Sequence, residues 1–409
     1  MALDCTAENK KALYRTVPWV PIPFLKSVPL SLEIAEEETR EAVLGTGNTS
    51  PGSDGITVAL LAAAWPHMAK AVHMLFLSAV RVGYHPRAFR NAEVVMIPKP
   101  GKAPHNTAKK WRPISLLSCI GKGLERLLAR RVARTAIAFG IIPAQYFGAL
   151  PKRACTDLVA CLIHDIEKAL AKDMIAALIT LDVSGAFDIV LCKRLIYRLR
   201  QQGWPDAFVH WAESFMTGRT VTIRTTEGEI LPEINLSCGT PQGSPISPII
   251  FMLYLSPLLR LGNEDRRFGY ADDVSTLATG TTPASVAQRL QKEINLSLNW
   301  GAANMISFDP AKAELILFYR RKEQDTIRWL GVFLDSKLTL KRHIKVWSLK
   351  ALQAATFLRS LNKTRKGSPP NAVAQAAKAV VLSTTLFGAE AWYTGPTKSS
   401  LSIKKRKTI

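Results

Sequence analysis

The chain is short of acidic residues, and it lacks any paired-cysteine motif. Its 409 residues include 54 Lys and Arg against 32 Asp and Glu, which gives a net charge of +22. An excess of this size indicates a polyanionic partner, with nucleic acid first and an anionic membrane second. The six cysteines form no C-x-x-C pair, and no His pair completes a zinc pattern. We therefore expect free thiols rather than a zinc site or a disulfide framework.

Long apolar runs are missing as well. No run reaches the roughly 18 residues that a membrane span requires, and the longest, such as 249–255, is typical of a protein core. Asp4 and Glu8 make the N-terminal stretch polar, so we expect neither a secretory signal nor an organelle-targeting helix. Composition thus favours a folded protein that binds nucleic acid and has no membrane segment.

Short apolar strands are mixed with longer amphipathic helices along the chain, which predicts an α+β fold. No internal repeat is present. We expect strands near 93–98, 175–183, 268–277, 315–319 and 328–334, helices over 32–44, 58–82, 115–139 and 191–201, a hairpin over 220–236, and a basic helical stretch from about residue 341.

Two adjacent carboxylates, Asp272 and Asp273, lie between strand-like runs at the tip of a predicted β-hairpin. Adjacent like charges repel, so a tight turn with two acids needs water or a cation. Asp182 ends a continuous apolar strand and is therefore expected at the rim of a sheet. Two-metal phosphoryl transfer needs several carboxylates around two cations about 4 Å apart. Together these acids predict a Mg²⁺ site, whereas each alone fits a solvated turn or a strand cap.

Further stretches suit a nucleotide substrate. The Gly- and Pro-rich stretch 239–248 predicts a rigid loop whose backbone can approach a nucleotide and a template base. Lys99 and Arg112 flank a loop and are suited to a triphosphate. Lys312 is suited to protonating a leaving pyrophosphate, and the Trp-Leu-Gly turn at 329–331 to gripping a primer backbone. A structural connector and solvated basic loops are the alternatives for these stretches taken singly.

Taken in order, these blocks resemble a reverse transcriptase, and more specifically the reverse transcriptase domain of fungal non-LTR (LINE-like) retrotransposons. The resemblance covers about 36–393 and implies a right-hand polymerase of fingers, palm and thumb, with an antiparallel palm sheet backed by helices. It rests on Pro-Gly-Ser-Asp-Gly-Ile at 51–56, Lys-Pro-Gly-Lys at 99–102, Arg-Pro-Ile-Ser-Leu-Leu at 112–117, Gly-Ala-Phe-Asp at 185–188, Pro-Gln-Gly-Ser-Pro at 241–245, Tyr-Ala-Asp-Asp at 270–273 and Trp-Leu-Gly at 329–331.

The resemblance also implies roles for single residues. The three aspartates match the ligands of two Mg²⁺ ions, with the carbonyl of Val183 as a fourth ligand and Mn²⁺ as an alternative metal. Phe187 matches the steric gate that favours dNTPs over NTPs, and plain core packing is its alternative. The remaining matches are the triphosphate-binding Lys99 and Arg112, the substrate-contacting Gln242, Gly243 and Tyr270, and the primer grip of Trp329, Leu330 and Gly331.

The same resemblance divides the chain. We expect an irregular N-terminal segment at 1–30, fingers mainly at 31–170, the catalytic palm mainly at 171–320, a primer-grip turn with a basic helical thumb at 321–395, and a basic low-complexity tail at 396–409. The implied partners are an RNA template, a DNA primer, their RNA–DNA duplex and dNTPs, without a membrane. A nuclear location is expected, with a mitochondrial one as the alternative, and the oligomeric state is not indicated.

Some positions depart from the family. Lys152 and Cys155 stand where Gly and Ser are usual, and the residues after Lys102 also differ, which affects the expected template contacts. The chain is too short for the endonuclease and RNase H domains of full-length elements. The leading hypothesis is the RNA-directed DNA polymerase of a truncated retrotransposon. An inactive nucleic-acid-binding remnant is the alternative, and Phe187 argues against an RNA-dependent RNA polymerase.

Overall fold

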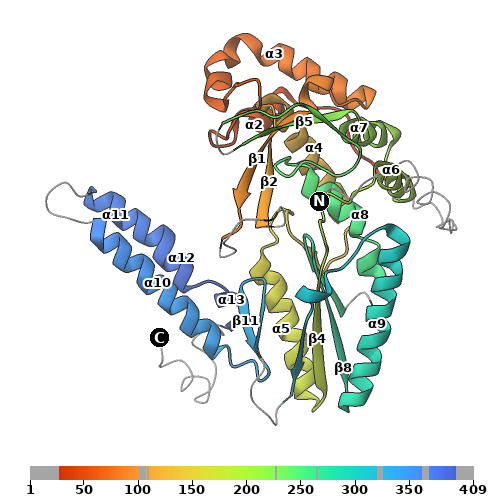
Figure 1. Cartoon of the computed structure of the whole chain (residues 1–409), viewed down its shortest axis with the longest axis vertical. Coiled ribbons are helices and arrows are strands. Elements are labelled where there is room, and N and C mark those ends of the chain that lie inside the picture. Colours follow the sequence, from red (N-terminus) through yellow and green to blue (C-terminus); the bar gives the residue numbers. More distant parts are fainter. Residues whose placement is uncertain are drawn as a thin grey trace. The chain divides into compact units, whose positions relative to one another are not determined.

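Two compact units make up the chain, each assembled from three separate segments. The computed structural model describes residues 27–100, 107, 110–225, 228–263, 266–319, 326–361 and 368–392 (Figure 1). Unit 1 comprises Met1–Pro151, Val183–Leu261 and Asn299–Ser307, and unit 2 comprises Lys152–Asp182, Gly262–Leu298 and Phe308–Ile409. The predicted borders of fingers, palm and thumb stay a prediction.

Unit 1 contains a mixed sheet with the strand order β2-β1-β5-β6. Strand β1 pairs antiparallel with β2 and parallel with β5, and β5 pairs antiparallel with β6, which confirms the predicted hairpin over 220–236. The helix predicted from Ser115 is wrong in its first residues, because Ser115 and Leu116 belong to strand β2, opposite Val94 and Glu93 of β1. The strands are β1 (Asn91–Pro98), β2 (Trp111–Leu116), β5 (Arg219–Arg224) and β6 (Ile234–Leu236).

The helices of unit 1 enclose a core rich in aromatic side chains. Phe76, Trp211 and Phe251 are each at most 1% exposed. The remaining elements of unit 1 are α2 (Glu36–Leu44), α3 (Val58–Val82), η1 (Arg87–Phe89), α4 (Cys119–Ala138), β3 (Tyr146–Phe147), α6 (Cys192–Gln201), α7 (Asp206–Met216), α8 (Ser247–Leu255) and η3 (Leu258–Arg260).

Helix α3 qualifies the expectation that no segment is apolar enough for a membrane span. It has 25 residues, and it is the one helix in the described part of the chain that is long and apolar enough to cross a membrane by length and composition. Its first turn is capped by Thr57, whose side chain accepts a hydrogen bond from the backbone N–H of Leu60 at 3.2 Å. One such helix is weak evidence of a span, because core helices pass the same test.

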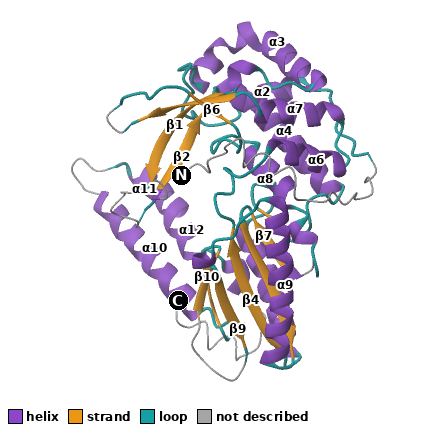
Figure 2. Ribbon diagram, turned by 45° about the vertical axis from the view of Figure 1, so that its right-hand side comes forward, coloured by secondary structure: helices purple, strands orange, loops and turns teal. Residues whose placement is uncertain are grey.

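Unit 2 is built on an antiparallel sheet in which the strands β7-β8-β4-β9 lie in that order (Figure 2). Helix α9 packs on this sheet through Val286 and Leu290, which meet Ala177 and Ala278 of the two central strands. The observed mixture of helices and an antiparallel sheet agrees with the predicted fold class. The elements are α5 (Cys155–Ala171), β4 (Ile175–Asp182), β7 (Arg267–Tyr270), β8 (Asp273–Gly280), α9 (Pro283–Asn304, whose last turns belong to unit 1), η5 (Pro310–Lys312) and β9 (Glu314–Phe318).

A small hairpin and a group of helices complete unit 2. The single strand predicted at 328–334 is wrong, because the chain reverses at Leu330 and Gly331, where φ is +48° and +85°. Helix α10 lies beside the stretch that contains α11 and α12 (Figure 1). The elements are β10 (Thr326–Trp329), β11 (Val332–Asp335), α10 (Lys341–Leu361), α11 (Pro370–Ala376), the π-helical η6 (Ala377–Leu382), α12 (Ser383–Thr385) and α13 (Ala389–Trp392).

Candidate active site

Three aspartates come together at one end of the sheet of unit 2. Strand β4 ends at Asp182 and β8 begins at Asp273, and these two residues lie opposite each other in the antiparallel register. Asp272 immediately precedes Asp273 in the turn between β7 and β8. The buried apolar residues of both strands precede or follow the acids, so the carboxylates lie where the core ends. The structure therefore groups the three predicted metal ligands within one unit.

The turn that presents Asp272 is strained. Tyr270 pairs with Asp273, so Ala271 and Asp272 form a two-residue hairpin connection. Ala271 has φ +53°, a left-handed conformation that costs an L-residue about 1–2 kcal/mol. Such strain persists where the surrounding structure fixes it, and it is common at functional sites. Tyr270, a predicted substrate contact, is half-buried beside this turn, and burial raises the pKa of its hydroxyl.

Lys312 provides a cation at the acid cluster. Its Nζ lies 2.6 Å from Oδ2 of Asp182 and 3.8 Å from Oδ2 of Asp309. The backbone N–H of Asp309 donates to the carbonyl of Asp182 at 2.9 Å, which fixes η5 against the end of β4. The hydrogen bond with Asp182 raises the pKa of Lys312, so the side chain is an ammonium ion at neutral pH. Because Lys312 is about half exposed, we expect this ion pair to contribute little to stability.

The two adjacent acids resist ionisation. Burial raises the pKa of Asp272, and the carboxylate of Asp182 acts in the same direction. The pKa of Asp273 is raised to about 6, by burial first and then by repulsion from Asp272 and Asp182. Lys312 opposes both shifts without cancelling them. The site therefore carries more negative charge than its own cation neutralises.

The donor set fits a hard divalent cation, although its side chains are not arranged around one. Among the residues that the structure describes, no group of three or more His, Cys, Asp or Glu side chains forms a metal-ligating cluster. Asp182 directs Oδ2 at the ammonium of Lys312 instead. Carboxylate oxygens are nevertheless the ligands that Mg²⁺ prefers, and their raised pKa values show a cluster that an added cation would stabilise. The metal-ligand roles stay a prediction.

Phe187 lies in a turn of unit 1 that packs against the loop 239–248. Its carbonyl accepts a hydrogen bond from the backbone N–H of Thr240 at 2.7 Å. Its ring centroid is 5.8 Å from that of Phe251, and the residue is half-buried. Gly239 has φ +84°, and a Cβ there would come within 3.1 Å of the Phe187 carbonyl. The ring thus makes the core contact of the packing alternative, and its role as a steric gate stays a prediction.

The loop that carries Gln242 and Gly243 is held from two sides within unit 1. The carbonyl of Gln242 accepts the backbone N–H of Ser115 at 2.7 Å. Gly243 has φ +135°, and a Cβ there would lie 2.5 Å from the Ser115 carbonyl oxygen, so no side chain fits. On the other side, Ser244 Oγ donates to Oε2 of the buried Glu125 at 2.5 Å. Strand β2 and helix α4 therefore fix the path of the loop.

Lys99 and Arg112 lie near the same end of the β1–β2 hairpin. Arg112 is opposite Ile97 in the register, and the backbone N–H of Lys99 donates to the carbonyl of Lys110 at 2.8 Å. Lys102, between them in sequence, lies outside the described residues. Unit 1 thus gathers the two predicted triphosphate-binding cations on one hairpin. Their roles, and that of the buried Val183, stay predictions.

The predicted primer grip is the connection between β10 and β11. Trp329 is 3% exposed, and its ring meets Phe268 edge-on at a centroid distance of 6.4 Å. Leu330 and Gly331 are half-buried and form the turn itself. Trp329 therefore anchors the hairpin in the core, and the turn residues are the ones available to a ligand.

Sequence reasoning assigned no role to two residues beside these sites. Asp309 stands three residues before Lys312, and its position before Pro310 is a helix-cap signal that could have indicated it. Glu125 holds Ser244 across a separation of 119 residues, for which the chain offers no local signal.

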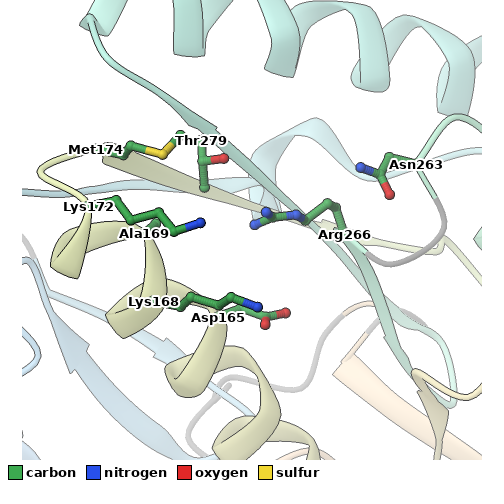
Figure 3. A pocket seen from close by; sticks show the side chains of 8 residues that line it. All are labelled: Asp165, Lys168, Ala169, Lys172, Met174, Asn263, Arg266 and Thr279. Carbon is green, nitrogen blue, oxygen red and sulfur yellow. The ribbon is translucent and has the colours of Figure 1, made fainter.

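A cavity of about 320 Å³ lies elsewhere in unit 2 (Figure 3). Thr279, one of its lining residues, is at the opposite end of β8 from Asp273, so the cavity is separate from the acid cluster. Lys168 and Lys172 line it from the C-terminal end of α5, where cations complement the helix dipole. The lining residues are Asp165, Lys168, Ala169, Lys172, Met174, Asn263, Arg266 and Thr279.

Comparison with known proteins decides the family. The sequence model of the family described as "Reverse transcriptase (RNA-dependent DNA polymerase)" matches residues 97–334, which is more than half of the chain and includes all three aspartates. The chain belongs to the reverse transcriptase family. The blocks from Lys99 to Gly331 on which the resemblance rested lie within this match.

Relatives of this reverse transcriptase domain come from mobile elements. It is 26% identical over 380 residues to the RNA-directed DNA polymerase from mobile element jockey of Drosophila melanogaster, covering 85% of this chain and 40% of that protein. Identity is 27% over 330 residues to the probable RNA-directed DNA polymerase from transposon X-element of the same fly, covering 76% and 36%. A 115 kDa protein in the type-1 retrotransposable element R1DM is 26% identical over 388 residues, covering 91% and 37%.

These relatives identify the chain as a reverse transcriptase domain of the non-LTR retrotransposon kind, and the chain spans well under half of their lengths. All three come from a fly, so a fungal source stays a prediction. Among solved structures, apo telomerase from Candida tropicalis matches with a TM-score of 0.45 and 12% sequence identity, covering 74% of this chain and 58% of that one.

Proposed function

We propose that the chain is the polymerase part of a non-LTR retrotransposon protein, and that it adds dNTPs to the 3′-hydroxyl of a DNA primer on an RNA template. The observation that carries the proposal is the group of three aspartates at one end of the sheet of unit 2, with Lys312 beside them. The family match and the names of the relatives support the same activity. The net charge of +22 suits a template, a primer and their duplex.

In the reaction, the 3′-oxygen of the primer forms a bond to the α-phosphorus of the dNTP. The bond between the α-phosphorus and the oxygen that bridges to the β-phosphorus breaks, and pyrophosphate leaves. Two Mg²⁺ ions, or Mn²⁺ in their place, would lower the pKa of the attacking hydroxyl and neutralise charge on the leaving pyrophosphate. Asp182, Asp272 and Asp273 are the residues that would hold them, with the carbonyl of Val183. Lys312 keeps its proton at neutral pH, which is the form that a general acid for pyrophosphate requires.

Unit 1 supplies the residues proposed for substrate binding. Lys99 and Arg112 would bind the triphosphate, for which a guanidinium offers two parallel donors. Phe187 would crowd a ribose 2′-hydroxyl and so favour dNTPs over NTPs. The fixed backbone at Gln242 and Gly243 supports an approach to the nucleotide and template base. A nuclear location follows from the use of nuclear DNA by elements of this kind and is part of the proposal.

Primer extension tests the proposed function. An RNA template with a DNA primer is incubated with dNTPs and Mg²⁺, using the wild type beside Asp272→Asn. We expect extension by the wild type and a loss of about a thousandfold or more in the variant, because a lost ligand removes electrostatic stabilisation of the transition state. Asp165→Asn is the matched control, since it removes a carboxylate from α5 at the other end of the sheet.

A folded wild type that extends no primer would contradict the proposal and favour the inactive nucleic-acid-binding remnant. Equal loss in Asp165→Asn and Asp272→Asn would show a folding effect rather than a site. Incorporation of GTP as readily as dGTP would contradict the assignment of Phe187 and point to an RNA polymerase. Salt dependence of binding does not separate these outcomes, because any nucleic-acid-binding protein of this charge shows it.

A further inference from the structure

The turn at Leu330 and Gly331 has a conformation that its own sequence does not favour. Both residues have positive φ, at +48° and +85°, in a two-residue connection between Trp329 and Val332. Two successive positive φ values are typical of a type I′ hairpin turn, in which Asn and Gly are the usual residues. A leucine there carries a steric penalty, so neighbouring side chains must hold the turn.

Helix α10 and the segment after α12 supply that support. The indole Nε1 of Trp347 donates a hydrogen bond to the carbonyl of Gly331 at 3.2 Å. The ring of Phe387 also packs against Gly331, where a Cβ would come within 3.1 Å of it. The rings of Trp347 and Phe387 stack on each other with centroids 4.3 Å apart. The stacked pair of rings therefore supports the turn through one hydrogen bond and one close packing contact, both at Gly331.

His343 joins the same parts through both ring nitrogens. Nδ1 lies 3.3 Å from the backbone N–H of Phe333 in β11, and Nε2 lies 2.9 Å from the carbonyl of Phe387. Because an N–H can only donate, Nδ1 is the acceptor, and this network assigns the proton to Nε2. Gly388, at φ +70°, packs against the imidazole and Val332. His343 thus ties the hairpin to the chain that carries Phe387.

The two α10 residues act as a pair because they are four positions apart and so lie on one face of the helix. His343 is 1% exposed and Trp347 is half-buried. The ammonium of Lys350 lies 4.1 Å from the centre of the Trp347 ring and covers its outer side. Any displacement of α10 would therefore move the carbonyl of Gly331 and the backbone of β11 together.

We propose that His343 and Trp347 are positioning residues that hold the Leu330–Gly331 turn in its left-handed form for contact with the primer strand near its 3′ end. The inference rests on the proposed function, since it needs a primer to be bound. It goes beyond the primer-grip assignment by naming the helix that controls the turn. Its ligand is the sugar–phosphate backbone of a primer terminus, which the turn meets through backbone groups and a leucine.

Two substitution pairs test this inference. Trp347→Phe keeps the stacked ring and removes the donor to Gly331. Trp211→Phe is the matched control, because it makes the same change in the core of unit 1, where the indole nitrogen has no hydrogen-bond partner among the described residues. His343→Gln can still accept from Phe333 and donate to Phe387, whereas His343→Leu does neither.

The measurements are the KM for primed template, the KM for dNTP, and the Kd for primed template and for unprimed single-stranded RNA. We expect Trp347→Phe to raise the KM and Kd for primed template about fivefold, the size of one lost hydrogen bond, and to leave the KM for dNTP unchanged. We expect about a tenfold rise for His343→Leu and a value within about twofold of wild type for His343→Gln. Trp211→Phe and binding of unprimed RNA should not change.

Several results would overturn the inference. If Trp347→Phe and His343→Leu bind primed template as tightly as the wild type, the positioning role is contradicted, and the proposed polymerase function is unaffected. Equal weakening for primed and unprimed RNA would show a general structural effect. If the wild type extends no primer but binds primed template, the proposed function fails and the Kd comparison still decides the positioning role. If it binds neither, both proposals fail.

Discussion

Each unit of the molecule holds carboxyl groups whose pKa burial raises, yet their surroundings differ. In unit 1, Glu125 is fully buried with a pKa of about 7, and its Oε2 accepts a hydrogen bond from Ser244. Nearby Arg219 and Lys122 lower that pKa in part, so the protein supplies its own compensating charges. In unit 2, the aspartates are only partly buried, repel one another and share one ammonium.

The difference separates a carboxyl group that stabilises a loop from the carboxyl groups of the proposed metal site. Glu125 lies 3.6 Å from His85, whose pKa is lowered to about 3 by burial and by nearby arginines, so the imidazole is neutral. Buried polar groups of this kind stabilise a structure only when their partners stay in place. The acid cluster has the opposite character, because repulsion among its carboxylates is only partly compensated and lowers stability. A raised pKa alone therefore does not identify an active site.

The largest expected effect that tests the difference between the two units is the effect of substituting Asp273. Asp273→Asn should reduce primer extension by about a thousandfold or more, because a proposed metal ligand is lost. It should also raise stability by about 1 kcal/mol, because repulsion is relieved in a partly solvent-screened cluster. Primer extension and thermal unfolding of the same preparations measure the two effects. A variant that lost activity and stability together would contradict the difference drawn between the units.

The reverse pattern is expected at Glu125. Glu125→Leu should destabilise the protein by about 2–4 kcal/mol, because the buried hydroxyl of Ser244 loses its acceptor and the buried Arg219 loses a nearby carboxyl group. Denaturant unfolding measures the change. Glu41→Leu is the control, since Glu41 is 62% exposed in its ion pair with Arg130 and should change stability by less than about 1 kcal/mol. Equal effects of the two substitutions would show that Glu125 is not a structural centre.

The smallest expected effect is a pH dependence that appears only when the buried pair is broken. The pKa of Glu125 rises on folding from 4.5 to about 7, so its stabilising contribution is full below pH 4.5 and is lost as pH rises to 7. The pKa of His85 falls from 6.5 to about 3, so its contribution is full above pH 6.5 and is lost as pH falls to 3. Between pH 4.5 and 6.5 the two slopes oppose each other.

In Glu125→Gln, only the slope of His85 remains, so stability should increase with pH over 4.5–6.5 by at most about 1.4 kcal/mol per pH unit. In His85→Asn, stability should decrease over the same range, and in the wild type these two groups should nearly cancel. Unfolding free energies at several pH values measure this. The same slope in all three proteins would mean that the pair does not titrate as described.

Local pattern in the sequence was enough for the acid hairpin. Apolar runs on both sides of Asp272 and Asp273 predicted its strands, and the end of the apolar run at Asp182 predicted the third acid at a strand end. The stretch at 329–331 is predicted both as a primer-grip turn and as part of a strand over 328–334. The strand prediction fails because the positive φ of Leu330 is supported by Trp347 and Phe387 rather than by a turn-forming residue at that position.

Contacts between distant segments explain the other differences. Ser115 was assigned to a helix, since its pairing with β1 is not visible in a local pattern. The hydrogen bond between Glu125 and Ser244 likewise joins two segments whose sequences give no sign of each other. The sequence therefore predicts the acidic residues at strand ends well, and it misses the contacts between distant segments that hold the loops and turns in place.

The alternation of segments between the units has a consequence for synthesis of the protein. On the ribosome, β1 emerges well before β5, its parallel partner, and β4 emerges long before β9, with which it pairs from Ala176↔Phe318 to Thr180↔Glu314. Unit 2 cannot complete its sheet until most of unit 1 has been translated, because Val183–Leu261 of unit 1 lies between β4 and the strands β7, β8 and β9. Nascent chains that stop before β9 expose an unpaired edge of β4, which favours aggregation or chaperone binding. The end of β4 that carries Asp182 therefore gains its full sheet only after β9 (Glu314–Phe318) has left the exit tunnel.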